Sequence, residues 1–89
     1  MDKDLLRKEI VYRMSYRGTL ELDTLCRVVM PYVTEMEEEK LLAVRDLMLE
    51  REGDLMLWLI EGGAVPPERR EVVGWMKELF KKHHVAGRS

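Results

Sequence analysis

The chain has 89 residues, with 15 Lys and Arg against 17 Asp and Glu and a net charge of −2. This length predicts one small domain, and the near balance of charge argues against nonspecific binding to nucleic acid, which depends on neutralising phosphates. The longest apolar run, residues 55–60, is far shorter than the roughly 20 residues that a bilayer requires. The single cysteine excludes an internal disulfide and fits a reducing compartment.

The N-terminus reads Met-Asp-Lys-Asp and shows neither the apolar stretch of a secretory signal nor a transit peptide. We therefore expect a protein of the bacterial cytoplasm, with the mitochondrial matrix as the less favoured location. We expect one helical domain over residues 1–89, ordered from about 4 to 82, that is a monomer when free.

Apolar residues recur at helical spacing through the first half of the chain, and no alternating strand pattern persists. The first predicted helix begins with Asp4 as its N-cap and ends at Gly18. The second runs as far as Val33, with its apolar residues three and four positions apart. Pro31 lies late in this helix, where it should kink the helix or end it early.

Two further helices are predicted in the middle of the chain. Thr34 and Glu37 have the spacing of a capping box, which predicts the start of a third helix that closes at Gly53. Asp54 is placed to cap a short fourth helix over residues 55–60, which is apolar on nearly every side and is therefore expected to be buried.

The last helix follows Gly62-Gly63 and begins after Pro66-Pro67, because proline tolerates the first helical position. Residues 83–89 carry no apolar stripe and are expected to fray. The pattern predicts an all-α fold, a compact antiparallel five-helix bundle. Its expected core consists of Leu6, Ile10, Met14, Leu25, Val29, Leu41, Val44, Met48, Leu55, Leu59, Val72, Met76 and Phe80.

The connection between the first two helices concentrates polar groups. Residues 16–23 read Tyr-Arg-Gly-Thr-Leu-Glu-Leu-Asp, and Gly18 is expected to turn the corner with a positive φ. Glu21 and Asp23 then fall in the first turn of the next helix, where the helix dipole favours negative charge. These residues are explained by a structural role alone, in which one helix ends and the next begins. Exposed polar groups on a tight loop also suggest a binding site.

Exposure distinguishes these two interpretations. A binding site predicts that Arg17 and Glu21 project into solvent without a full set of internal partners. A buried Arg17 with a saturated guanidinium would instead favour the structural corner.

Motifs for catalysis and metal binding are missing from the sequence: there is no Gly-rich phosphate loop, HExxH, CxxC or GxSxG. Cys26 lies on an apolar stripe and is expected to be an inert core residue. His83 and His84 are adjacent, so on a helix they point about 100° apart and cannot clamp one metal from a shared face. We therefore predict no enzyme activity, no metal and no stably bound cofactor.

Trp75 is the remaining candidate. It lies beside the main apolar stripe of the last helix and next to Gly74, where the backbone can be approached closely. A partly exposed Trp is a candidate anchor for a protein partner.

Three segments in order resemble the succinate dehydrogenase assembly factor family, the small flavinylation factors of bacteria and mitochondria. The first is R-G-T-L-E-L-D at residues 17–23, which matches the family pattern R-G-x-x-E-L-D. The second is M-P-Y at residues 30–32, and the third is G-D-L-M-L-W-L-I at residues 53–60. The resemblance covers roughly residues 5–82. The chain departs from the family at Tyr16 and Thr19, where the family often has Arg and Met.

The resemblance implies a five-helix bundle that binds the flavoprotein subunit of succinate dehydrogenase or fumarate reductase and promotes covalent attachment of FAD to it. The FAD would belong to this client protein. The partner-binding residues implied by the matching motif are Arg17, Gly18, Glu21 and Asp23, and Tyr16, on the same loop, and Trp75, as a separate anchor, are added as further candidates. Arg17 would offer a forked donor to a client carboxylate or carbonyl, Gly18 would admit the client backbone, and Glu21 would pair with a client cation or brace Arg17.

Two alternatives of other classes compete with this interpretation. A small helical regulatory or antitoxin-like interaction module, unrelated to flavinylation, would require a basic groove-facing helix if it bound DNA, which the near-balanced charge disfavours. A small enzyme would require a pocket with titratable groups of shifted pKa.

Overall fold

A computed structural model describes residues 2–15 and 17–86 of the chain, and within these ranges it contains five α-helices and no strand. The predicted all-α fold is confirmed. The helices and the shorter helical turns, in chain order, are α1 (Lys3–Met14), α2 (Leu20–Val33), α3 (Glu38–Met48), α4 (Glu52–Leu55), the π-helical turn η1 (Met56–Ile60), the 3₁₀ turn η2 (Pro67–Arg69) and α5 (Arg70–Ala86).

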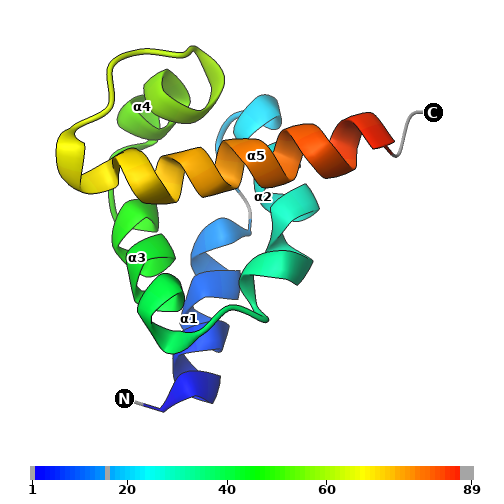
Figure 1. Ribbon diagram of the computed structural model, residues 1–89, viewed down its shortest axis with the longest axis vertical. Helices are drawn as coiled ribbons and strands as arrows, with labels where there is room; N and C mark the ends of the chain where they lie inside the picture. The colour runs from blue at the N-terminus through cyan, green and yellow to red at the C-terminus, as the bar shows by residue number, and fades with distance from the viewer. Residues whose placement is uncertain (1, 16, 87–89) are drawn as a thin grey trace.

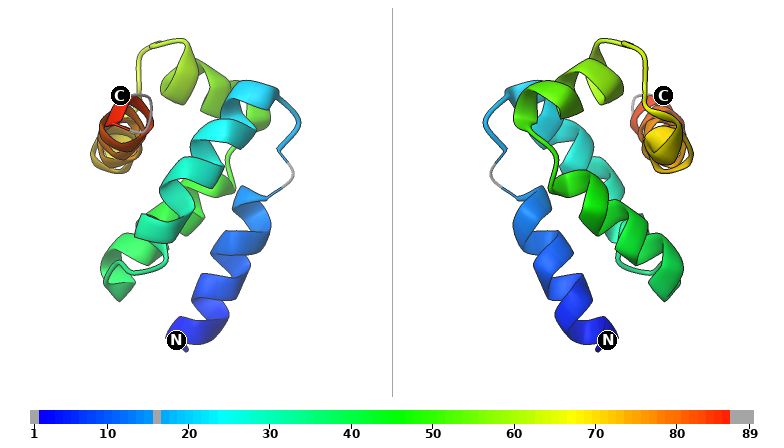
Figure 2. Two further views of the ribbon diagram at one scale, coloured as in Figure 1. Left: turned by 90° about the vertical axis from the view of Figure 1, so that its right-hand side faces the viewer. Right: turned by 90° about the vertical axis from the view of Figure 1, so that its left-hand side faces the viewer.

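Helices α1, α2 and α3 run in alternating directions, and α1 packs against both of the others (Figure 1). Helix α5 lies across α2 and α3 instead of continuing this alternation, so it is seen nearly end-on in Figure 2. The short α4 and η1 lie beside the start of α2. This arrangement brings the loop before α2 close to the loop before α4, although the two are far apart in the sequence.

The core agrees closely with the apolar stripes. Every predicted core residue is buried except Phe80, which is half-buried at the edge. Within residues 55–60, which were expected to be buried, Leu55, Trp58 and Leu59 are buried, but Leu57 is exposed. No helix in the described ranges has the length and apolar character needed to cross a bilayer.

Several helix boundaries differ from the predicted ones. Asp2, not Asp4, caps α1, and its carboxylate accepts from the Asp4 N–H at 2.8 Å. Thr34 and Glu37 form no capping box, because Glu37 is the N-cap residue of α3 without a side-chain bond, and the Thr34 hydroxyl donates to the Pro31 carbonyl instead.

The fourth helical segment starts earlier than predicted and changes its pitch. Its first residue is Glu52, so Gly53 and Asp54 lie inside the helix and neither closes nor caps one. The following turn is π-helical, with the Glu61 N–H donating to the Met56 carbonyl at 2.9 Å, and Gly62 then leaves the helix with a φ of 77°.

The C-terminal helix continues beyond the predicted point. Helix α5 extends to Ala86, whereas the chain was expected to fray from residue 83, and residues 87–89 lie outside the described ranges. The His83 ring stacks on Tyr32 with centroids 3.9 Å apart, which ties α5 to the end of α2.

Candidate functional site

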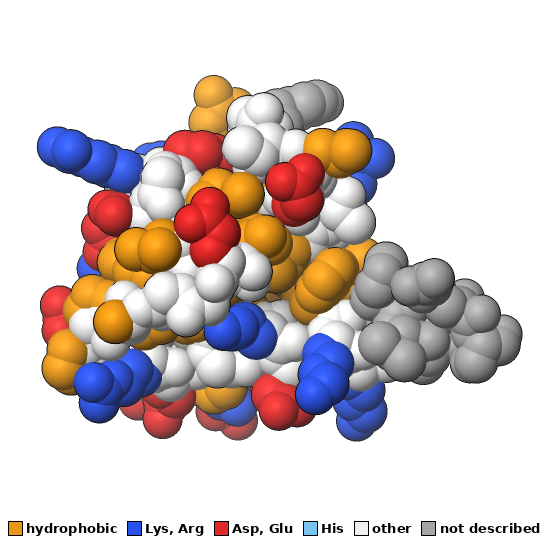
Figure 3. All heavy atoms as spheres, turned by 90° about the horizontal axis from the view of Figure 1, so that it is seen from above, with side chains coloured by type: hydrophobic (Ala, Val, Ile, Leu, Met, Phe, Trp, Pro, Cys, Tyr) orange, Lys and Arg blue, Asp and Glu red, His pale blue; other side chains and the backbone are white. Residues whose placement is uncertain are grey.

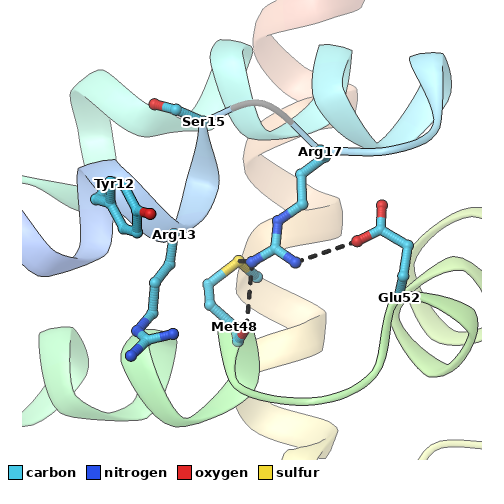
Figure 4. A pocket seen from close by; sticks show the side chains of 6 residues that line it. All are labelled: Tyr12, Arg13, Ser15, Arg17, Met48 and Glu52. Atoms are coloured by element: carbon cyan, nitrogen blue, oxygen red, sulfur yellow. Dashed lines mark hydrogen bonds and ion pairs between the residues drawn. The ribbon is translucent and has the colours of Figure 1, made fainter.

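Arg17 turns inward from the loop between α1 and α2 (Figure 4). Its Nη1 donates to Glu52 Oε1 at 3.2 Å, and its Nη2 donates to the Met48 carbonyl at 3.1 Å. The side chain is only 12% exposed, so Arg17 does not project into solvent as the binding-site interpretation requires. The guanidinium instead connects the loop between α1 and α2 to the end of α3 and the start of α4.

Glu52 completes this connection from the other side. Its second oxygen, Oε2, accepts from the Gly18 N–H at 3.0 Å, while Oε1 accepts from Arg17. One carboxylate therefore binds a side chain and the adjacent backbone of the same loop. We call Arg17, Glu52 and the Gly18 N–H the loop clamp.

Gly18 does not turn the corner in the way predicted. The only glycine with positive φ in the described chain is Gly62, and α1 ends at Met14, well before Gly18. A Cβ added to Gly18 would lie 3.7 Å from Glu52 Oε2, which is an ordinary contact. Gly18 is exposed, so a side chain at this position would obstruct another molecule that approaches the loop.

Arg17 is nevertheless not saturated. Its Nε is buried and has no hydrogen-bond partner among the described residues. Beside it lies an open cavity of about 300 Å³, lined by Tyr12, Arg13, Ser15, Arg17, Met48 and Glu52 (Figure 4). Internal partners therefore hold both Nη atoms of Arg17, as expected for a structural corner. The Nε donor has no partner among the described residues.

The two acidic residues of the tract differ in their surroundings. Asp23 is largely shielded and pairs with Arg27, whose Nη2 lies 3.0 Å from Oδ2. Glu21 is exposed, and within the described part of the chain its carboxylate has neither a hydrogen bond nor an ion pair. The exposure prediction therefore agrees with the position of Glu21 but not with that of Arg17.

Cys26 lies in the core behind the loop clamp. Burial raises the pKa of its thiol from 9.0 to about 11; Arg17 opposes this rise, and the carboxylates of Asp23 and Glu52 add to it. The thiolate is therefore scarce near neutral pH, which gives the thiol no nucleophilic role.

Trp75 does not join the loop clamp. Its half-buried ring packs against the edge of the core, and the Lys40 ammonium lies 4.9 Å from the ring centroid. It lines a different hollow with side chains of α5, among them Lys77 and Lys81. Tyr16, the remaining candidate, lies outside the described residues.

A second surface feature adjoins the tract. An open groove of about 380 Å³ is lined by Leu20, Glu21, Thr24, Leu59, Ile60 and Phe80. Figure 3 shows hydrophobic side chains gathered on the face seen from above, with acidic side chains among them. Sequence reasoning identified Glu21 but missed this groove, because Leu59 and Phe80 were assigned wholly to the core.

Sequence reasoning also missed Glu52 and Met48 as parts of the clamp. They contact Arg17 across sequence separations of 35 and 31 residues, and no local motif marks such a pairing. The predicted bounds placed Glu52 at the end of the third helix, directly before Gly53, where nothing indicated a contact with Arg17.

Among the described residues, no group of three or more His, Cys, Asp or Glu side chains is placed to hold a metal ion. No family model matches the chain, and no curated protein or solved structure shows significant similarity to it.

Proposed function

We propose that this protein is an assembly factor that binds the flavoprotein subunit of succinate dehydrogenase or fumarate reductase and promotes covalent attachment of FAD to that subunit. The ordered R-G-x-x-E-L-D, M-P-Y and D-L-x-x-W-L segments support the proposal. The observation that carries it is the geometry of the tract, in which an inward Arg17 fixes the loop while Gly18 and Glu21 remain exposed.

The loop clamp changes the role proposed for Arg17. With both Nη atoms occupied by Glu52 and Met48, Arg17 acts as a positioning residue and not as the donor to a client carboxylate. A loop held at several points keeps its shape before binding, which reduces the entropy lost when a partner is bound.

Gly18 and Glu21 are then the residues proposed to touch the client. Gly18 presents backbone without a side chain, so a client segment can approach it closely. Glu21 lies on the first turn of α2 and offers a carboxylate that has no partner among the described residues, suited to a Lys or Arg of the client.

The proposed mechanism is selection of a conformation and not catalysis by this chain. The bond to FAD would be made by the flavin and a histidine of the client, and FAD would stay with the client. The factor would bind most tightly the client conformation in which the flavin and the histidine are close. It can favour this conformation only by as much as its affinity differs between the conformations of the client.

Reconstitution with purified components tests the proposal. The flavoprotein subunit, prepared without flavin, is mixed with FAD in the presence and absence of the factor, and covalently bound flavin is followed after denaturation. We expect the factor to raise the rate and Glu38→Ala, an exposed control on α3, to act like the wild type. Equal rates with and without the factor would contradict the proposal.

A further inference from the structure

The groove next to the loop clamp is built from three parts of the chain. Leu20, Glu21 and Thr24 come from the start of α2, Leu59 and Ile60 from the end of η1, and Phe80 from α5. Because all three parts also pack into one core, the groove has a fixed floor with an open side.

Leu20 contributes apolar surface that the fold does not use. It is 76% exposed at the first residue of α2, while the buried stripe of that helix begins at Leu22 and continues through Leu25. Together with half-buried Ile60 it offers apolar area whose burial would favour association.

The charge of the groove has one sign. Glu21 is the single charged residue among its described lining residues, and Lys or Arg is not found there. The nearby lysines of α5, Lys77 and Lys81, line the separate hollow at Trp75. An apolar groove whose rim carries a carboxylate with no partner in the described part of the chain is complementary to an apolar side chain followed by a cation.

We infer that this groove takes a segment of the client flavoprotein in which an aliphatic side chain is adjacent to a Lys or Arg. The aliphatic side chain packs against Leu20, Ile60 and Phe80, and the cation pairs with Glu21. This inference rests on the proposed function, since it names the part of the client that the same surface recognises.

The test compares three full-length variants in calorimetric titrations against the purified flavoprotein subunit. Leu20→Ala removes apolar surface and Glu21→Lys reverses the charge; Leu5→Ala is the matched control, because Leu5 is 63% exposed on α1 and does not line the groove. We expect each groove variant to weaken binding about tenfold or more, and the control to change it by less than about twofold.

The outcomes separate the groove from the function. If the wild type binds and both groove variants bind equally well, the groove inference is overturned while the proposed function stands. If the wild type does not bind, the proposed function fails, and the groove is tested alone with a short Leu- and Lys-containing peptide and its Lys→Glu counterpart. In that case the assignment of the groove to the client is overturned as well; amide resonances of Leu20, Thr24 and Ile60 that shift only with the Lys peptide support the preference of the groove for an aliphatic side chain next to a cation, and equal or absent shifts overturn that preference.

Sedimentation of the free protein completes the test. Self-association of the wild type that Leu20→Ala abolishes would show that a second copy fills the groove, which would overturn the assignment to the client. A monomer at every concentration used in the titrations is the expected result.

Discussion

Glu52 binds Arg17 and Gly18 at the same time, through Oε1 at 3.2 Å from Arg17 Nη1 and through Oε2 at 3.0 Å from the Gly18 N–H. The two carboxylate oxygens thus hold a side chain and a backbone group of one loop from a helix that begins more than thirty residues later. A single acidic residue of α4 therefore sets the position of the tract that we propose binds the client.

Removing this carboxylate should loosen the loop and lower stability. We expect Glu52→Ala to reduce the free energy of unfolding by about 1–2 kcal/mol, because Arg17 and Gly18 lose acceptors while the half-exposed position allows water to replace part of the interaction. Urea denaturation followed by circular dichroism measures the change. Asp46→Ala, which removes the partner of the neighbouring Arg45, is the control and should cost less than about 0.5 kcal/mol; an equal loss in both variants would contradict the clamp.

Reversing the charge of Arg17 should act on the fold before it acts on binding. Arg17→Glu places two carboxylates together in a largely shielded position, and we expect it to destabilise the protein by about 2–4 kcal/mol. The double variant Arg17→Glu, Glu52→Arg restores opposite charges and should recover part of this loss in the same denaturation experiment. If the double variant is no more stable than the sum of the two single effects predicts, Arg17 and Glu52 are not energetically coupled.

The glycines should respond differently to an added methyl group. Gly18→Ala should leave the free energy of unfolding within about 0.5 kcal/mol of the wild type, because the new Cβ meets only Glu52 at ordinary contact distance. Gly63→Ala should cost about 1–3 kcal/mol, because its Cβ would overlap the Leu57 side chain. Thermal unfolding of both variants measures this difference, and a larger loss for Gly18→Ala than for Gly63→Ala would contradict the described loop geometry.

The raised pKa of the Cys26 thiol predicts a pH dependence. Since the folded-state pKa is about 11 and the ordinary value is 9.0, the native state retains the proton that the unfolded state loses between these values. Stability from this group is therefore fully present below pH 9 and is lost as pH rises toward 11, by about 1 kcal/mol at the middle of the window.

Denaturation of the wild type and of Cys26→Ala across this range isolates the contribution of the thiol, because the other titrating groups are shared. The wild type should lose stability more steeply than the variant. Parallel curves would contradict the burial of the thiol. Iodoacetamide should also fail to label Cys26 near neutral pH until urea is added.

The sequence predicted the helices well because their apolar residues repeat at a period that only a helix satisfies. Leu6, Ile10 and Met14 are buried as the spacing indicated, and the same holds on α2 and α3. Helix ends were predicted less well, since the capping side chain depends on local geometry: Asp2 and not Asp4 caps α1, and Thr34 is the C-cap residue of α2 and not the N-cap of α3.

The candidate site was predictable in composition but not in arrangement. Glu21 could be identified from its place in a polar loop, whereas the inward turn of Arg17 depends on Glu52 and Met48, which only the tertiary fold brings near. The groove depends in the same way on the crossing of α5 over α2, which periodicity within one helix cannot specify. Whether these residues bind the client stays a prediction.

In-gel flavin fluorescence of the denatured client tests the central claim most directly, because it reports only FAD that is covalently attached. A strain lacking this protein should contain the client without fluorescence, and the wild type or Glu38→Ala should restore it. Gly18→Trp and Glu21→Lys, both at exposed positions, should leave most of the fluorescence missing although each variant is present at ordinary levels. Normal fluorescence in the strain lacking the protein, or in both variants, would contradict the account.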